Sequence, residues 1–312
     1  MALPKLINLG VRLAVIASIG SAALAAQAPV ARFSSGIDLV SVSAFVRDHK
    51  GRFVDNLTAR DFEILDAGQL RPIADFRRDL AGVSVGLLFD VSGSMESTLP
   101  DAREAAMHLL SWLESRDEAA IFTFDTRLDE VAPFTSGLKT LPHSMSTVTP
   151  FGATSLHDAI ARMAERVGMR EGRRRAVVVF SDGRDNASRM TPGQVSAVAS
   201  SIDVPVYIFA AVPSIDNPTT EFATNESGSS LTGPLSDLAA WTGGRVFVAS
   251  TPGTRSAAAR QIVDELRHQY LIAFESSGAS GWHPLVVRAR NKDLTVRARS
   301  GYIAGQSRPS SD

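Results

Sequence analysis

Asp90, Ser92 and Ser94 alternate at the end of an apolar run, and each side chain carries oxygen atoms that can bind a metal ion. Oxygen donors suit hard divalent cations such as Mg²⁺, Mn²⁺ or Ca²⁺ better than Zn²⁺. The preceding residues 83–89 are typical of a strand that is buried on both faces in a parallel sheet. Such a strand ends at the edge where open α/β sheets bind ligands. The sequence therefore predicts a metal site at this edge.

The stretch from Phe89 to Met95 resembles the first motif of von Willebrand factor type A domains, the metal-ion-dependent adhesion site. In that family two further loops complete the site, one with a Thr and one with an Asp. Residues 152–156 open a helical pattern and supply the matching Thr154. Residues 177–183 form a second buried strand that ends in Asp182. All five positions match the family pattern in its order and approximate spacing.

The resemblance implies a role for each side chain. Hydroxyls at the positions of Ser92, Ser94 and Thr154 touch the metal directly in the family, whereas carboxylates at the positions of Asp90 and Asp182 act directly or through water. Two carboxylates balance a divalent cation and neutral hydroxyls add no charge, so the metal can accept one outside carboxylate. Alone, the first motif could equally be a solvated turn, but three motifs at three strand or loop ends favour the metal. Mg²⁺ is the favoured ion, with Mn²⁺ or Ca²⁺ as alternatives.

Three polar residues near these motifs are open to two interpretations. Asp185 and Asn186 either support the metal ligands or belong to a solvated loop. His157 could line the site, but a lone His on a helix is more often a surface or core residue. The remaining histidines show no spacing suited to zinc, namely His49, His108, His143, His268 and His283. We predict no catalytic residue and no organic cofactor.

The N-terminus indicates export. Lys5 and Arg12 precede an apolar stretch at 13–26 that ends in small residues, which is typical of a cleaved secretory signal peptide at 1–26. A membrane anchor is the alternative, but the uncharged run is shorter than the roughly 18 apolar residues that a spanning helix usually needs. We expect a mature protein that is secreted or periplasmic and has no membrane span. The absence of cysteine excludes thiol catalysis and disulfide bonds.

Alternating apolar strands and amphipathic helices across residues 81–269 predict a doubly wound α/β domain with a mostly parallel sheet, the type A domain of the resemblance. Expected helices follow the first and second motifs and occupy 195–202, 235–241 and 257–267. The segment 128–134 is expected to be an edge strand that Pro133 stops. The polar stretch at 214–233 is expected to be a long loop.

Short β segments flank this domain. In the first, at 33–80, Val40, Val42, Ala44 and Val46 alternate with Ser41, Ser43 and Phe45, the period of a half-buried strand, before a hairpin turn at 48–51. The second, at 270–304, contains two strands that we expect to form a hairpin at 291–293. Because an isolated hairpin is marginally stable, we expect both segments to share one β-sandwich into which the α/β domain is inserted. A polar tail follows at 305–312. The first segment resembles that of a secreted bacterial group with type A domains, common in acidobacteria, which has no settled activity.

Charge gives little support to nucleic-acid binding. Lys and Arg number 32 and Asp and Glu number 33, which leaves a formal net charge of -1. Four arginines are expected on one face of the C-terminal hairpin, where they could bind an anionic surface, but the balanced charge favours a solvated face. They are Arg288, Arg290, Arg297 and Arg299.

Three functional hypotheses remain. The leading one is a secreted, metal-dependent, adhesion-type module in which an Asp or Glu carboxylate of a protein partner completes the coordination of the ion. A metal-dependent hydrolase would use the ion to activate water, but the sequence has no His-Glu-x-x-His helix to supply a base. A structural envelope module, whose ion only stiffens the loops, is the third. We therefore expect a protein partner and no enzyme activity.

Overall fold

The computed structural model describes residues 39–78, 81–170, 173–201, 203–210 and 233–304. The predicted signal peptide at 1–26, the polar tail at 305–312 and all but the last residue of the long loop predicted at 214–233 lie outside these ranges. In the described part of the chain, no helix is both long enough and apolar enough to cross a membrane.

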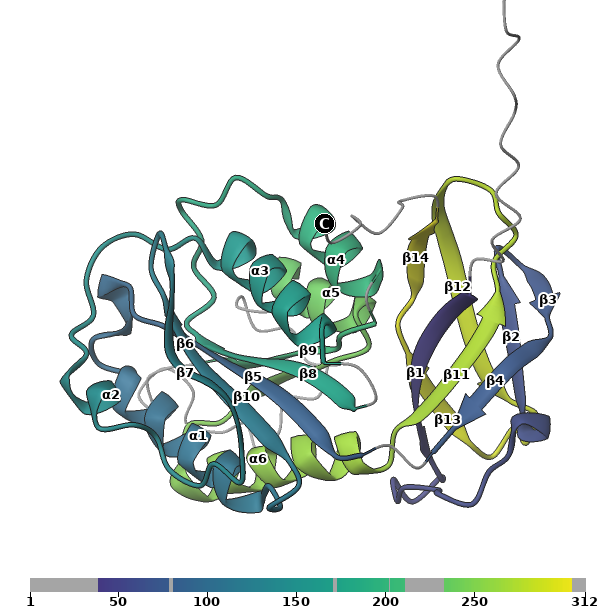
Figure 1. Ribbon diagram of the computed structural model, residues 1–312, viewed down its shortest axis with the longest axis horizontal. Coiled ribbons are helices and arrows are strands. Elements are labelled where there is room, and N and C mark those ends of the chain that lie inside the picture. The colour runs from purple at the N-terminus through teal and green to yellow at the C-terminus, as the bar shows by residue number, and fades with distance from the viewer. Residues whose placement is uncertain (1–38, 79–80, 171–172, 202, 211–232, 305–312) are drawn as a thin grey trace, which may run out of the picture. The chain divides into compact units, whose positions relative to one another are not determined.

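A six-stranded sheet forms the centre of the α/β domain (Figure 1). In spatial order its strands are β10 (Val246–Val248), β9 (Val206–Ala210), β8 (Arg174–Ser181), β5 (Val83–Asp90), β6 (Glu118–Phe124) and β7 (Leu128–Ser136). Neighbouring strands are parallel except for β7, which pairs antiparallel with β6. The expected mostly parallel sheet is confirmed.

Helices cover both faces of this sheet (Figure 1). One face is covered by α1 (Leu99–Trp112) and α6 (Pro252–Arg267). The other is covered by α3 (Leu156–Gly168), α4 (Pro192–Ser201) and α5 (Gly233–Trp241). A short helix, α2 (Ser144–Thr147), lies between β7 and α3 in the chain. The doubly wound architecture is therefore also confirmed.

Strand β5 is enclosed along its whole length. All eight of its residues are buried, with Leu87 in the core beneath α1 and α6 and Leu88 in the core beneath α3. Gly86 allows α3 to come close, since a Cβ at this position would lie 2.1 Å from Met163 Cε. The next strand in the chain, β6, lies on one side of β5, and the later strand β8 lies on its other side. The carboxyl end of β5 is therefore a topological switch point. Ligand sites of open α/β sheets form at such switch points.

Strands from both ends of the chain pair in two antiparallel four-stranded sheets. The first sheet contains β13 (Thr295–Ala298), β1 (Leu39–Arg47), β11 (Tyr270–Glu275) and β4 (Ile73–Arg77). The second contains β14 (Gly301–Ala304), β12 (Gly281–Ala289), β2 (Phe62–Asp66) and β3 (Gln69–Arg71). Val42, Ile64, Ile272 and Val287 belong to the core that both sheets share. These strands form a β-sandwich with the α/β domain inserted.

Strand β1 departs from the half-buried alternation that its sequence predicts. Ser43 and Phe45 are 6% and 2% exposed. The backbone N–H and the hydroxyl of Ser43 donate to the carboxylate of Asp203 at 3.0 and 2.7 Å, and the Arg297 guanidinium lies 4.7 Å from the centre of the Phe45 ring. Asp203 belongs to the α/β domain, so that domain covers the second face of β1. Alternation within one strand does not reveal such a cover.

Two predictions about the C-terminal strands are wrong. The expected hairpin at 291–293 does not form, because β12 and β13 belong to different sheets. The connection passes from one layer of the sandwich to the other. The four arginines therefore do not share a solvated face: Arg299 is 3% exposed, and Arg297 forms an ion pair with the buried Glu265 of α6. Arg288 and Arg290 do remain largely exposed.

The structure also differs from the sequence predictions at one proline and at one turn. Strand β7 continues through Pro133, at which the sequence predicts its end. It is an edge strand with irregular pairing near this residue, and an edge position tolerates a missing N–H. The hairpin expected around 48–51 is reduced to a single bridge between Arg47 and Phe53.

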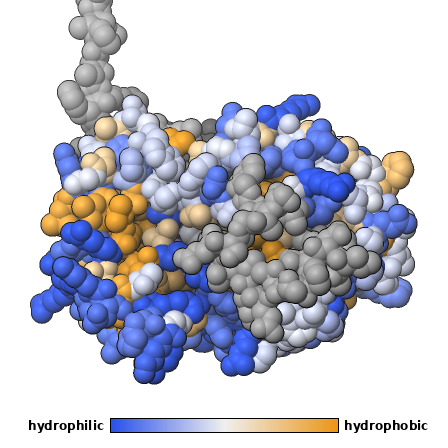
Figure 2. Space-filling model, turned by 180° about the vertical axis from the view of Figure 1, so that it is seen from behind, coloured by the Kyte–Doolittle hydropathy of each residue, from blue (hydrophilic) through white to orange (hydrophobic). Residues whose placement is uncertain are grey.

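The outer face of the β14-β12-β2-β3 sheet exposes apolar side chains (Figure 2). Trp282 and Val286 of β12 are 49% and 53% exposed, and Leu70 of β3 is 63% exposed. Val286 pairs with Leu65, which in turn pairs with Leu70, so an apolar row crosses three strands. Contiguous apolar residues mark contact surfaces in many proteins, but nothing among the described residues shows what covers this row.

Candidate metal centre

The first predicted loop directly follows β5. Asp90 is the last residue of the strand and is fully buried, Ser92 is 1% exposed, and Ser94 is exposed. The Ser92 N–H donates to Asp90 Oδ1 at 2.9 Å, and the hydroxyl oxygens of Ser92 and Ser94 lie 3.2 Å apart. A 3-10 turn, η2 (Gly93–Met95), places the Met95 side chain in the core and thereby fixes the loop.

The second loop, which carries Thr154, lies against the first. The Gly93 N–H donates to the Gly152 carbonyl at 3.2 Å, and the Phe151 N–H donates to the Val91 carbonyl at 2.8 Å. Gly152 has a φ of +87°, a conformation that favours glycine. Thr154 is 2% exposed, and its hydroxyl has no hydrogen bond within the described part of the chain. This hydroxyl is therefore available as a ligand.

The third loop follows β8 and carries Asp182, whose side chain is 13% exposed. It is joined to the second loop, because the N–H groups of Asn186 and Ala187 both donate to the Thr154 carbonyl, at 3.1 and 3.0 Å. In return the Thr154 N–H donates to Asn186 Oδ1 at 2.8 Å. Hydrogen bonds thus connect all three predicted loops.

The Asp90 carboxylate is enclosed by hydrogen-bond donors and a second acid. Ser181 at the end of β8 donates its hydroxyl to Asp90 Oδ2 at 2.6 Å, and the Ser92 N–H occupies Oδ1. Burial raises the pKa of Asp90 above its usual range, and the charge of Asp182 adds to this rise, while hydrogen bonds from Ser181 and Ser92 oppose it. Asp90 ends β5, and Asp182 directly follows the neighbouring strand β8. A cation between them would relieve their repulsion.

The donor set suits a hard divalent cation. It combines two carboxylates with three hydroxyls, and it contains no sulfur or imidazole ligand. No group of three or more His, Asp or Glu among the described residues could hold a metal, so acids alone would not make a site. The residues predicted from the sequence therefore fit Mg²⁺, Mn²⁺ or Ca²⁺ by their chemistry.

Residues 85–184, which include the first, second and third loops up to Arg184, match the family model described as von Willebrand factor type A domain. The chain contains a von Willebrand factor type A domain. Domains of this family commonly act as protein-interaction modules. A comparison with curated protein sequences found no match to this chain.

Solved structures similar to this chain include three bacterial proteins of low sequence identity. An aerotolerance-related membrane protein from Bacteroides fragilis is 20% identical, with a TM-score of 0.49 over 59% of this chain and 98% of that chain. The conserved hypothetical protein BatB from Bacteroides thetaiotaomicron is 19% identical, with a TM-score of 0.46 over 59% and 98%. A von Willebrand factor type A protein from Catenulispora acidiphila is 14% identical, with a TM-score of 0.46 over 88% and 76%.

Asp185 and Asn186, one acid and one amide beyond Asp182, hold the third loop of the type A domain against α3 and the second loop. Asp185 Oδ2 accepts from the His157 N–H at 2.9 Å and lies 2.6 Å from His157 Nδ1. Burial raises the pKa of Asp185, but hydrogen bonds from Ser188 and His157 outweigh it and hold the pKa below its usual value. Of the two interpretations open from the sequence, support of the ligand loops is therefore the better one for Asp185 and Asn186.

Sequence reasoning did not single out Ser181 or Arg184. Ser181 donates to Asp90 because β8 lies beside β5. Its position directly before Asp182 in the sequence is the signal from which Ser181 could have been predicted. Arg184 Nε lies 3.5 Å from Asp182 Oδ2, and its side chain is 76% exposed. A surface pair of this kind contributes little to stability. It does place a positive charge at the rim of the site.

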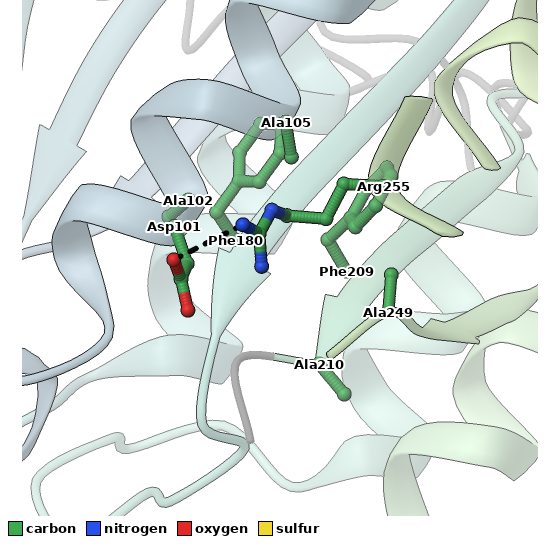
Figure 3. Close-up of a pocket in the computed structure, with 8 residues that line it drawn as sticks. All are labelled: Asp101, Ala102, Ala105, Phe180, Phe209, Ala210, Ala249 and Arg255. Atoms are coloured by element: carbon green, nitrogen blue, oxygen red, sulfur yellow. Dashed lines mark ion pairs between the residues drawn. The ribbon is translucent and has the colours of Figure 1, made fainter. Parts of the chain in front are cut away.

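A pocket beside the type A site is too small for an organic ligand (Figure 3). Arg255 of α6 extends between α1 and the ends of β8 and β9, and its Nη2 lies 3.3 Å from Asp101 Oδ1 and 2.6 Å from Glu104 Oε2. The pocket has room of about 10 Å³, which suits roughly one water. Arg255 Nε has no hydrogen-bond partner among the described residues, and one water would satisfy it.

Proposed function

We propose that this protein is an exported binding module whose type A domain holds a divalent cation, with Mg²⁺ as the favoured ion. Asp90, Ser92, Ser94, Thr154 and Asp182 would hold it, and an Asp or Glu side chain of a protein partner would complete its coordination. The observation that carries the proposal is the hydrogen bonding between the three loops, which bear a buried carboxylate, a second acid and three hydroxyl groups at the ends of β5 and β8 and before α3.

The carboxylates and the hydroxyls would contribute differently to holding the cation. Asp90 and Asp182 supply negative charge, whereas Ser92, Ser94 and Thr154 supply neutral oxygen atoms. When bound, the cation would provide a positive centre that attracts an outside carboxylate. A set with two acids leaves a divalent ion able to accept that carboxylate, because the protein does not add a third negative ligand.

We propose binding rather than catalysis. His157 is the histidine next to the site. Asp185 accepts a hydrogen bond from the backbone N–H of His157 at the start of α3 and lies 2.6 Å from the ring Nδ1 of that histidine. These contacts fit a role in fixing the third loop on the helix. The predicted signal peptide at 1–26 supports placement of the module outside the cytoplasm.

Titration calorimetry with Mg²⁺, Mn²⁺ and Ca²⁺ tests the proposal. Asp90→Ala and Asp182→Ala should abolish binding because each removes balancing charge, and Ser92→Ala should weaken it less because it removes a neutral ligand. Asp293→Ala is the matched control, since this exposed acid lies in the connection between β12 and β13. It should bind metal like the wild type.

Thermal melts of the same variants give an independent readout. A metal at a hundredfold excess over its dissociation constant should stabilise the wild type by about 2.7 kcal/mol. Asp90→Ala should lose this gain and keep its fold, because the buried strands below are unchanged. A wild-type protein that melts identically in Mg²⁺, Mn²⁺, Ca²⁺ and chelator would overturn the proposal.

A further inference from the structure

Phe151 is the most exposed large apolar residue in the described part of the chain, with 82% of its surface accessible. It lies three residues before Thr154 in the second loop. Isolated exposed apolar residues are common on protein surfaces, so exposure alone assigns no role. Its position beside the candidate metal ligands sets it apart.

The backbone around Phe151 is fixed to the first loop. The Phe151 N–H donates to the carbonyl of Val91, the residue between Asp90 and Ser92, and the following Gly152 carbonyl accepts from the Gly93 N–H. No atom lies within 4 Å of a Cβ built on Gly152, so its φ of +87°, rather than lack of space, favours glycine there. The ring is thus presented from a backbone with a defined place relative to the site.

The described part of the chain leaves the Phe151 ring largely uncovered. The side chain of Glu96 in the first loop and that of Thr149 in the second are exposed and polar. An exposed aromatic side chain on a backbone that is held by hydrogen bonds to the neighbouring loop has the character of an interface anchor, because little backbone entropy is lost when a partner covers it.

We propose that Phe151 selects the partner by packing against a large apolar side chain two residues away from the partner's acidic residue. The inference rests on the proposed function, in which that acid completes the metal site. Three residues of chain from Phe151 to Thr154 span at most about 10 Å. In an extended partner segment, residues i and i+2 point to the same side and lie about 7 Å apart. An acid and an apolar residue at this spacing therefore reach the ion and the ring together.

Fluorescein-labelled peptides provide defined probes for the test. The first is an extended Gly-rich peptide with one Asp and a Leu two residues before it, the second has Ser in place of Leu, and the third has Asn in place of Asp. Binding is measured by fluorescence anisotropy with Mg²⁺ and with chelator. The proteins are the wild type, Phe151→Ala and Met169→Ala. Met169 is the matched control because it is 75% exposed and follows the far end of α3.

The wild type and Met169→Ala should bind the Leu peptide about tenfold more tightly than the Ser peptide. Phe151→Ala should bind both peptides equally, with the affinity that the wild type has for the Ser peptide. Its calorimetric affinity for Mg²⁺ alone should be unchanged, which shows that the site itself is intact. Chelator or the Asn substitution should abolish binding in every case.

The outcomes separate this inference from the proposed function. Metal-dependent binding of Asp peptides without a preference for Leu, or a preference that Phe151→Ala retains, would overturn the role of Phe151 and leave the metal site standing. Failure of every Asp peptide to bind in Mg²⁺ would overturn the carboxylate-binding function and this inference with it.

Discussion

Replacing Glu265 with Gln should destabilise the protein where the type A domain meets the β-sandwich. The Glu265 side chain is fully buried on α6, and it faces three arginines: Arg47 at 3.1 Å from β1, Arg245 at 3.6 Å, and Arg297 of β13. The Tyr207 hydroxyl also donates to it, at 3.0 Å. One carboxylate therefore balances three guanidinium groups that belong to both parts of the fold.

The magnitude follows from the burial of these groups. Removing one partner of a buried ion pair costs about 3–5 kcal/mol, because the remaining charge stays uncompensated. The arginine side chains are 21–27% exposed, so water screens part of this cost. We therefore expect a loss of about 3 kcal/mol for Glu265→Gln, or roughly 6–12 °C in melting temperature for a domain of this size.

Urea unfolding at pH 7, followed by circular dichroism, measures this loss. Glu275→Gln is the matched control, since Glu275 is exposed at the end of β11. The control should unfold at the wild-type urea concentration. An unchanged midpoint for Glu265→Gln would refute the reasoning, because it would mean that the three arginines do not need the carboxylate.

The stability difference between the wild type and Glu265→Gln should also depend on pH, which provides a second check. Burial raises the pKa of Glu265, but Arg297, Arg245 and Arg47 outweigh it and hold the pKa below its ordinary value. A carboxyl with a lowered pKa in the folded state contributes stability above its unfolded pKa, which for Glu is about 4.3. This stability is lost as the pH falls through the folded pKa. The difference in free energy of unfolding between the wild type and Glu265→Gln should therefore be complete at pH 7. It should shrink as the pH falls below the unfolded pKa of Glu and through the folded pKa of Glu265.

Two further substitutions test polar contacts elsewhere. His283→Ala should cost about 1–3 kcal/mol in urea unfolding, because it leaves buried polar atoms without their partner: His283 Nδ1 lies 2.8 Å from the fully buried Asp66 carboxylate and Nε2 lies 2.8 Å from the Ala279 carbonyl. A wild-type midpoint would contradict the importance of this pair. Asp185→Ala should lower the Mg²⁺ affinity about 10- to 100-fold, because it frees the third loop from His157. Titration calorimetry measures this affinity, and an unchanged value would contradict the supporting role of Asp185.

Local patterns predicted the strand ends that carry the candidate site. Residues 83–90 and 177–181 are continuously buried, as their apolar runs indicate, and the polar residues after them share one sheet edge because parallel strands end together. The apolar runs alone predict that Asp90 and Asp182 lie at strand ends. The family resemblance is what joined them with Thr154 in one candidate site.

Contacts between distant segments could not be predicted in this way. Ser181 bonds Asp90 because two strands 91 residues apart in sequence are neighbours. Arg297 and Arg299 alternate like residues of a solvated face, yet the α/β domain covers them, and a strand's own pattern does not identify what lies above it. Asp203 reaches Ser43 from a backbone with a φ of +54°, which its local sequence does not signal.

The most direct test of a cation at the meeting point of the three loops is an anomalous difference map from crystals of the protein soaked in MnCl₂. We predict one strong peak in contact with the hydroxyl oxygens of Ser92, Ser94 and Thr154 and next to Asp90 and Asp182, which disappears in Asp90→Ala crystals. A map without a peak at these residues, or with the strongest peak elsewhere on the chain, would contradict the account.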